Sequence, residues 1–144
     1  FMRDVSLGCE QINEKIASTV GCTIEETETI KLGEESDIIS AEDLKEIVES
    51  VVADWCIEIK RALDFFYSSY PEEQISRIVL SGGGANIKKF IELLAAETSA
   101  EVEVINPFQN LIVDSNRFDA SYLEQIAPQA AICMGLATRK IGDK

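Results

Sequence analysis

Three consecutive glycines stand between an apolar run and a helical pattern, in the stretch RIVLSGGGANIKKF. They are Gly82, Gly83 and Gly84, followed by Ala85 and Asn86. A glycine turn between a parallel strand and a helix lies at the carboxyl edge of a sheet, where ligands of α/β folds bind. Its backbone N–H groups and the helix dipole suit an anion. Because the stretch matches neither GxxxxGK[ST] nor GxGxxG, three interpretations stay open: a structural tight turn, a nucleotide or phosphate site, or close helix packing.

A carboxylate and an ammonium stand three residues apart in the stretch TETIK, at Glu28 and Lys31. Residues at this spacing lie on one face of a helix, so the two charged groups can converge on the same partner. From the residues alone, the simpler interpretation is an ordinary surface ion pair that modestly stabilises a helix.

The composition excludes several kinds of chemistry and partner. The chain has no histidine, which removes histidine bases, histidine-activated nucleophiles and histidine metal ligands. Its four cysteines form no CxxC pair, so we expect free thiols in a reducing compartment. The formal net charge is −13, which repels phosphate backbones and anionic lipids. We therefore expect a cytoplasmic protein whose main partner is not nucleic acid.

The first two elements that must position these residues are predicted to be helices. The stretch CEQINEKIASTVG favours a helix that ends at Gly21, since Ile12 and Ile16 share one face. A second, short helix is expected from Thr23, because Thr23 and Glu26 match a capping box. This second helix carries the TETIK stretch.

The strongest helical pattern runs from Ser40 to Tyr70. Apolar residues recur along it every three or four positions, and Ser40 with Asp43 matches an N-terminal cap. Pro71 cannot continue the helix. A helix of this length is a rod of roughly 45 Å, which we expect to serve as a spine for the other elements.

Two strand patterns flank the helix that follows the glycines. ISRIVLS is a continuous apolar run, which suggests burial on both faces, and EVEVINP alternates. A strand, helix and strand over residues 77–107 predict a right-handed parallel crossover. The expected class is therefore α/β.

The two ends of the chain carry weaker patterns. FMRDVSLG alternates loosely and predicts a short strand that ends at Gly8. Residues 108–127 are expected to form a loop with a short turn of helix, in which Asp114 and Asp119 are solvated turn residues. From Pro128 onward we expect a closing helix, with this proline in its first turn.

Five stretches together resemble one family. FMRDVSLG with EQINEKI, TETIK, RIVLSGGGANIKKF, EVEVINPF and APQAAICMGLATRK stand in the order found in the type IV pilus assembly proteins called PilM. That family is similar to the cell-division protein FtsA and belongs to the actin-like ATPase superfamily. The resemblance covers nearly all 144 residues and implies a fragment, the C-terminal portion of the second large actin-like domain. Residues 1–7 and 75–144 would form a subdomain with a partial mixed sheet and flanking helices, and residues 8–74 a mainly helical inserted subdomain.

The resemblance also implies a role for the glycines and for the charged pair. Residues 82–86 match the motif that faces the adenosine end of ATP, where a flat base can lie against a backbone without side chains. Glu28 and Lys31 match a pair that hydrogen-bonds the ribose in the superfamily. The implied cofactor of the full-length protein is ATP with Mg²⁺. The family usually has a small residue after Gly8, often glycine, and Cys9 departs from this pattern.

The function that the resemblance implies is an ATP-binding cytoplasmic scaffold of type IV pilus assembly, peripheral to the inner membrane. The implied partners are the cytoplasmic tail of PilN, bound mainly through the first domain, and other inner-membrane components of the pilus. The alternatives are an active phosphotransferase or ATPase of the same superfamily, or a secretion-system or FtsA-type relative without nucleotide turnover.

Two further expectations concern the chain by itself. No segment offers a DxG hairpin for phosphates and Mg²⁺, so we expect no ATP hydrolysis and weak or no nucleotide binding, and we assign no catalytic residue and no metal ligand. An incomplete sheet would leave a strand edge unpaired, which predicts a homodimer or strand exchange.

Overall fold

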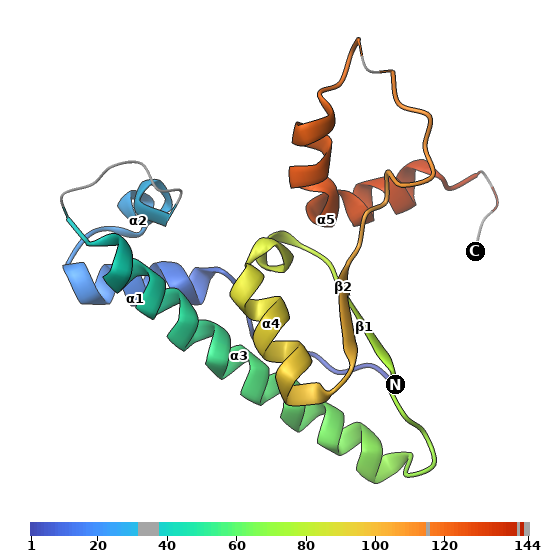
Figure 1. Cartoon of the computed structure of the whole chain (residues 1–144), viewed down its shortest axis with the longest axis horizontal. Coiled ribbons are helices and arrows are strands. Elements are labelled where there is room, and N and C mark those ends of the chain that lie inside the picture. Colours follow the sequence, from blue (N-terminus) through green and yellow to red (C-terminus); the bar gives the residue numbers. More distant parts are fainter. Residues whose placement is uncertain (32–37, 115, 141, 143–144) are drawn as a thin grey trace.

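The structure is a computed structural model that describes residues 1–31, 38–114, 116–140 and 142. Figure 1 shows the arrangement of its elements. They are, in chain order, α1 (Glu10–Val20), α2 (Ile24–Lys31), α3 (Ala41–Ser69), β1 (Arg77–Leu80), the short 3₁₀ helix η1 (Gly83–Asn86), α4 (Lys88–Thr98), β2 (Glu101–Val104) and α5 (Ala120–Ala137).

The 29-residue helix α3 is the spine of the fold, as predicted. Ser40 caps it by accepting a hydrogen bond from the Asp43 N–H at 3.1 Å, and Tyr70 ends it just before Pro71. Helices α1 and α4 both pack against α3, and α2 packs on α1 (Figure 1). The core lies between these four helices and contains Ile12, Ile16, Ile30, Ile47, Val51, Val52, Trp55, Cys56, Phe90 and Leu94.

The ends of α1 and α2 also follow the prediction. Gly21 stops α1 in the left-handed conformation, with φ of 75°, and its N–H donates to the Ala17 carbonyl at 2.8 Å. Thr23 and Glu26 form the predicted capping box, because the Thr23 N–H donates to Glu26 Oε2 at 2.7 Å and the Glu26 N–H donates to Thr23 Oγ1 at 3.4 Å. This box orients the helix that carries Glu28 and Lys31.

The sheet confirms the parallel crossover and corrects the expected burial. Strands β1 and β2 pair in parallel, with Ile78 opposite Val102, and α4 connects them. Ile78 and Val102 pack against the core, whereas Val79 on the opposite face is 49% exposed. The prediction that β1 is buried on both faces is therefore wrong in the part of the chain that the structure describes. An apolar run shows that both faces of a strand can be buried. Whether they are buried depends on which elements pack against each face.

The predicted N-terminal strand is not present, since residues 1–8 adopt no strand. The Phe1 ring instead lies against Phe65 and Phe66 of α3, with centroids 5.9 and 5.5 Å apart. Because its apolar side chain packs on a helix, this segment adds nothing to the sheet, which is parallel and not mixed within the described residues. Each strand keeps one edge without a strand partner in that region, so dimerisation or strand exchange stays a prediction. The division into subdomains of residues 1–7 with 75–144 and of residues 8–74 also stays a prediction.

Helix α5 begins eight residues before the expected start. Asp119 is its N-cap, and the Asp119 carboxylate accepts a hydrogen bond from the Tyr122 N–H at 2.8 Å. The expectation of a loop with only a short turn of helix up to residue 127 is therefore wrong. Asp119 is exposed as expected, but it caps a helix and does not form a turn. Pro128 lies inside α5, where it removes a backbone donor, and α5 changes direction about midway along its length (Figure 1).

The stability of the chain is expected to fall in acid through its two carboxylate caps. The pKa of Glu26 lies below its ordinary value of 4.5, first because the Thr23 N–H donates to it and then because the Thr23 hydroxyl does. The pKa of Asp119 lies below 3.8, first because of the Ser121 hydroxyl and then because of the Tyr122 N–H. A carboxyl whose folded pKa is depressed stabilises the fold above its unfolded pKa, and this contribution is lost as the pH falls through the folded pKa.

Thermal unfolding followed by circular dichroism from pH 7 to pH 3 measures this loss. Glu26→Gln and Asp119→Asn keep side chains that can cap a helix but do not titrate, so each is expected to flatten the acid limb of the melting-temperature curve. An acid limb of unchanged slope in both variants would contradict the prediction.

Candidate functional site

The glycine turn lies at the carboxyl end of β1, as predicted, and α5 covers one side of it. Gly82 has φ of 89° and ψ of 175°, and its N–H donates to the Pro128 carbonyl at 2.8 Å. The Asn86 amide donates to the Gln125 carbonyl at 3.1 Å. The Ala85 N–H donates back to the Gly82 carbonyl at 3.1 Å. Two backbone donors that would suit an anion are thus used within the protein, which disfavours a phosphate site here.

A cavity of about 380 Å³ opens on another side of the turn. A Cβ placed on Gly84 would lie 3.5 Å from Trp55 Cζ3 and 3.7 Å from Cys9 Sγ, so Gly84 faces these two side chains. The lining residues are mostly apolar: Leu7, Gly8, Cys9, Trp55, Ile59, Leu80, Ser81, Gly83, Gly84, Ala85 and Phe90. A flat apolar group suits such a wall better than a charged group does. We call this cavity the glycine pocket.

Trp55 is the fixed wall of the glycine pocket. It is 3% exposed, its Nε1–H donates to Gln11 Oε1 at 2.5 Å, and its ring meets Phe90 edge to face with centroids 5.5 Å apart. The spacing of apolar residues in α3 assigned Trp55 to the core face and nothing more. No pattern in the sequence indicates that Trp55 lies beside Gly84, because Gly84 comes 29 positions later in the chain.

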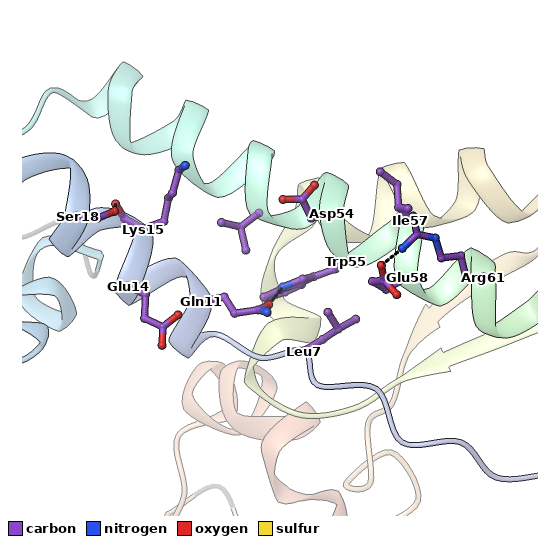
Figure 2. A pocket seen from close by; sticks show the side chains of 11 residues that line it. Leu7, Gln11, Glu14, Lys15, Ser18, Asp54, Trp55, Ile57, Glu58 and Arg61 are labelled. Carbon is purple, nitrogen blue, oxygen red and sulfur yellow. Dashed lines mark hydrogen bonds and ion pairs between the residues drawn. The ribbon is translucent and has the colours of Figure 1, made fainter.

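A larger groove of about 610 Å³ lies between α1 and α3, and Trp55 lines it too. Figure 2 shows its polar rim, with Glu14 and Lys15 on α1 and Asp54, Glu58 and Arg61 on α3. None of the residues predicted from the sequence to form a site lines this groove. The glycine pocket is therefore the better candidate, although it is smaller.

The charged pair forms as the spacing predicted. Lys31 Nζ lies 2.8 Å from Glu28 Oε1. Asn13 of α1 joins both groups, since its Nδ2–H donates to Glu28 Oε1 at 2.8 Å and its Oδ1 accepts from Lys31 Nζ at 3.1 Å. The pKa of Glu28 is lowered, first by the hydrogen bond from Lys31 and then by the one from Asn13. Asn13 was missed from the sequence, although it is a polar residue beside Ile12 on a face whose other members are apolar.

The first turn of α1 connects the charged pair to the glycine pocket. Cys9, the N-cap of α1, lines the pocket, and Asn13 lies four residues later, a rise of about 6 Å along the helix. Glu10 lies between them and accepts a hydrogen bond from Asn13 Nδ2 at 3.2 Å. Glu28 and Lys31 are thus linked to the glycine pocket only indirectly, through Asn13 and the first turn of α1.

The other predicted site residues are arranged unequally around the turn. Ala85 is 2% exposed and lines the glycine pocket from within the core. A Cβ on Gly83 would lie 3.5 Å from Gln129 Nε2, and Asn86 is bonded to α5. Gly84 thus faces Trp55 and Cys9, whereas Gly82 and Asn86 donate hydrogen bonds to carbonyl groups of α5.

Comparisons with known proteins agree with this architecture. The chain matches a family model described as type IV pilus assembly protein PilM over residues 1–141. It is also similar to a chain in a solved structure titled "PilM-PilN type IV pilus biogenesis complex", with a TM-score of 0.77 and 24% sequence identity. The match covers 94% of the present chain and 37% of that chain, so the present chain spans little more than a third of its relative. The shared α/β fold and the family match over nearly the whole sequence lead to one conclusion: the chain belongs to the PilM family of type IV pilus assembly proteins.

Proposed function

We propose that this chain is the adenosine-binding part of a cytoplasmic, ATP-binding, actin-like scaffold protein of type IV pilus assembly. The observation that carries the proposal is the glycine pocket, in which Gly84 faces the Trp55 ring, joined through the first turn of α1 to the Glu28–Lys31 pair. An adenine ring would lie against the backbone at Gly84, and the sugar would meet the charged pair. Membership of the PilM family supports the role in pilus assembly.

The residues of this chain that could contact ATP fit its adenosine end and not its phosphate end. The glycine pocket is apolar, and Glu28, whose side chain is 53% exposed, can accept a hydrogen bond from a sugar hydroxyl. The N–H groups of Gly82 and Ala85 are already bonded within the protein. Among the residues that the structure describes, no cluster of three acidic, cysteine or histidine side chains offers a site for Mg²⁺. The role of this chain is thus to bind and orient the nucleoside, and a change of domain arrangement on binding requires only that the nucleotide prefer one arrangement.

The partners and the cellular location are part of the same proposal. The similar structure is a complex of PilM with PilN. We extend this to the present protein, with the cytoplasmic tail of PilN and other inner-membrane pilus components as partners, bound mainly through the portion of the relative that the chain does not span. Such contacts would place it at the cytoplasmic side of the inner membrane. No described helix has the length and apolarity needed to cross a membrane.

Titration of the natural full-length protein with adenosine and with Mg²⁺-ATP tests the proposal. Isothermal calorimetry measures the affinity, and the fluorescence change that is lost on Trp55→Phe reports binding at the glycine pocket, which Trp55 lines. We expect adenosine to compete with ATP. Because a hydrogen bond to a charged group is lost, Glu28→Gln is expected to raise the Kd of both ligands about tenfold.

Glu25→Gln is the matched control, since Glu25 lies in the first turn of the same helix and outside the pair. It is expected to leave the Kd unchanged. Absence of binding of any adenine nucleotide by the full-length protein would overturn the proposal. Measurable phosphate release by that protein would favour the alternative of an active ATPase.

A further inference from the structure

We propose that Asn13 is the positioning residue of the sugar-binding pair, and that it makes the site select nucleosides by their ribose hydroxyls. This inference rests on the proposed function, because it concerns how the same site reads the sugar. Asn13 lies on α1, whereas Glu28 and Lys31 lie on α2, so Asn13 acts across the contact between the two helices.

The polar side chain of Asn13 is buried. The side chain is 3% exposed and follows Ile12, which is 1% exposed, while Ile16 one turn later is fully buried. A buried amide is unfavourable unless its donors and acceptor find partners, and an apolar residue would pack this position without that requirement. The amide is therefore explained by the groups it contacts.

Those contacts use the amide fully and fix its orientation. Nδ2 donates to Glu28 Oε1 at 2.8 Å and to Glu10 Oε2 at 3.2 Å, and Oδ1 accepts from Lys31 Nζ at 3.1 Å. Rotating the amide by half a turn would place a donor against the ammonium and an acceptor against two carboxylates. A single rigid group thus holds a carboxylate and an ammonium side by side.

The groups that remain free are those that a diol needs. Glu28 Oε1 accepts two of these bonds, and within the described residues Oε2 has no protein partner. Lys31 Nζ donates to Glu28 and to Asn13, which leaves one of its three hydrogens. The pair accordingly presents one acceptor and one donor side by side, the complement of two neighbouring hydroxyls. Fixing both side chains before binding reduces the entropy lost when the sugar is bound.

The Asn13 amide also connects the sugar-binding pair to the pocket proposed for the base. Its third partner, Glu10, follows Cys9, which lines the glycine pocket. A purine against Gly84 and a sugar at Glu28 would therefore both lie next to the first turn of α1. Loss of the Asn13 amide is expected to loosen the sugar end and leave the base end intact.

The experiment compares adenine, adenosine and 2′-deoxyadenosine by calorimetry on the natural full-length protein. The unchanged protein is expected to bind adenosine about tenfold more tightly than adenine. Asn13→Ala is expected to reduce this ratio to about threefold or less and to leave the Kd of adenine within about twofold, because only the sugar contacts lose their support. The unchanged protein is expected to bind adenosine more tightly than 2′-deoxyadenosine. This difference in Kd is expected to disappear in Asn13→Ala.

Asn13→Asp keeps the shape of the side chain and its acceptor for Lys31, but sets a carboxylate against Glu28 and Glu10. It serves if the alanine variant does not fold, and it is expected to lower the same ratio. Asn116→Ala is the matched control, since Asn116 is an exposed loop residue whose amide bonds Asp114. A folded Asn13 variant that keeps the adenosine-to-adenine ratio would show that Asn13 only joins two helices. Absence of binding of all three ligands by the unchanged protein would instead overturn the proposed function itself, and this inference with it.

Discussion

Replacing Trp55 by alanine is expected to lower the free energy of unfolding by about 3–5 kcal/mol, the usual cost of truncating a large buried aromatic side chain. Trp55 is 3% exposed and contacts three separate parts of the fold. Its ring meets Phe90 of α4 at an interplanar angle of 85°, its indole N–H donates to Gln11 of α1, and its edge lies beside Gly84. The variant therefore leaves a cavity where α1, α3, α4 and the glycine turn meet. Urea denaturation followed by far-ultraviolet circular dichroism measures the change.

Two other substitutions on α3 separate the contribution of the buried Trp55 ring to stability from that of its hydrogen bond. Trp55→Phe keeps an aromatic ring against Phe90 but loses the bond to Gln11, so we expect a smaller loss of about 1–2 kcal/mol. Ile57→Ala is the control for truncation on the same helix, because Ile57 is 49% exposed, and it is expected to cost less than about 1 kcal/mol. If Trp55→Ala and Ile57→Ala cost the same, Trp55 does not join these elements.

Gly82→Ala is expected to destabilise the chain by about 1–3 kcal/mol, whereas Gly84→Ala two residues away is expected to change stability by less than about 0.5 kcal/mol. With φ of 89° and ψ of 175°, Gly82 occupies a backbone region that side chains forbid. At Gly84 a methyl group would meet Trp55 at 3.5 Å, which is ordinary van der Waals contact. Chemical denaturation of both variants tests the contrast.

The same pair of variants separates the fold from the proposed site. The methyl group of Gly84→Ala would project toward Trp55 and Cys9, two residues that line the glycine pocket, and would narrow the pocket in which the proposal places the purine. We therefore expect this stable variant of the full-length protein to bind adenosine at least about tenfold more weakly. Unchanged affinity in a stable Gly84→Ala protein would place the base elsewhere, and equal stability of the two variants would contradict the strain at Gly82.

The comparison of sequence with structure shows which features are local. The start of α2 and both ends of α3 could be predicted, because the capping groups of Ser40 and Thr23 and the stop at Pro71 lie within a few residues of the backbone that they affect. The Glu28–Lys31 contact could be predicted for the same reason, since both residues lie on one turn of α2. The crossover from β1 to β2 followed from the order of the elements and the handedness rule for parallel strands.

Most of the predictions that failed depended on neighbours far away in the chain. The N-terminal segment alternates as a strand does, but Phe1 packs on Phe65 and Phe66. Asp119 is a common turn residue that caps a helix here. Helix α5 continues through Pro128, whose missing N–H explains the change of direction and whose carbonyl accepts hydrogen bonds from the Gly82 N–H and the Ser81 hydroxyl. The local pattern was compatible with two structures in each case. The N-terminal segment and Pro128 make contacts across the fold, whereas the Asp119 cap is a local contact with Tyr122.

The sequence by itself determined the α/β class, the caps of α2 and α3, the crossover and the family, because short-range hydrogen bonds and the order of the apolar patterns depend on residues that are close in the chain. The tertiary structure alone decided that Trp55 lies beside Gly84 and that Asn13 holds Glu28 and Lys31. Both contacts join residues on different helices or turns, and their geometry depends on how α1, α2 and α3 pack, which no spacing within a single helix encodes.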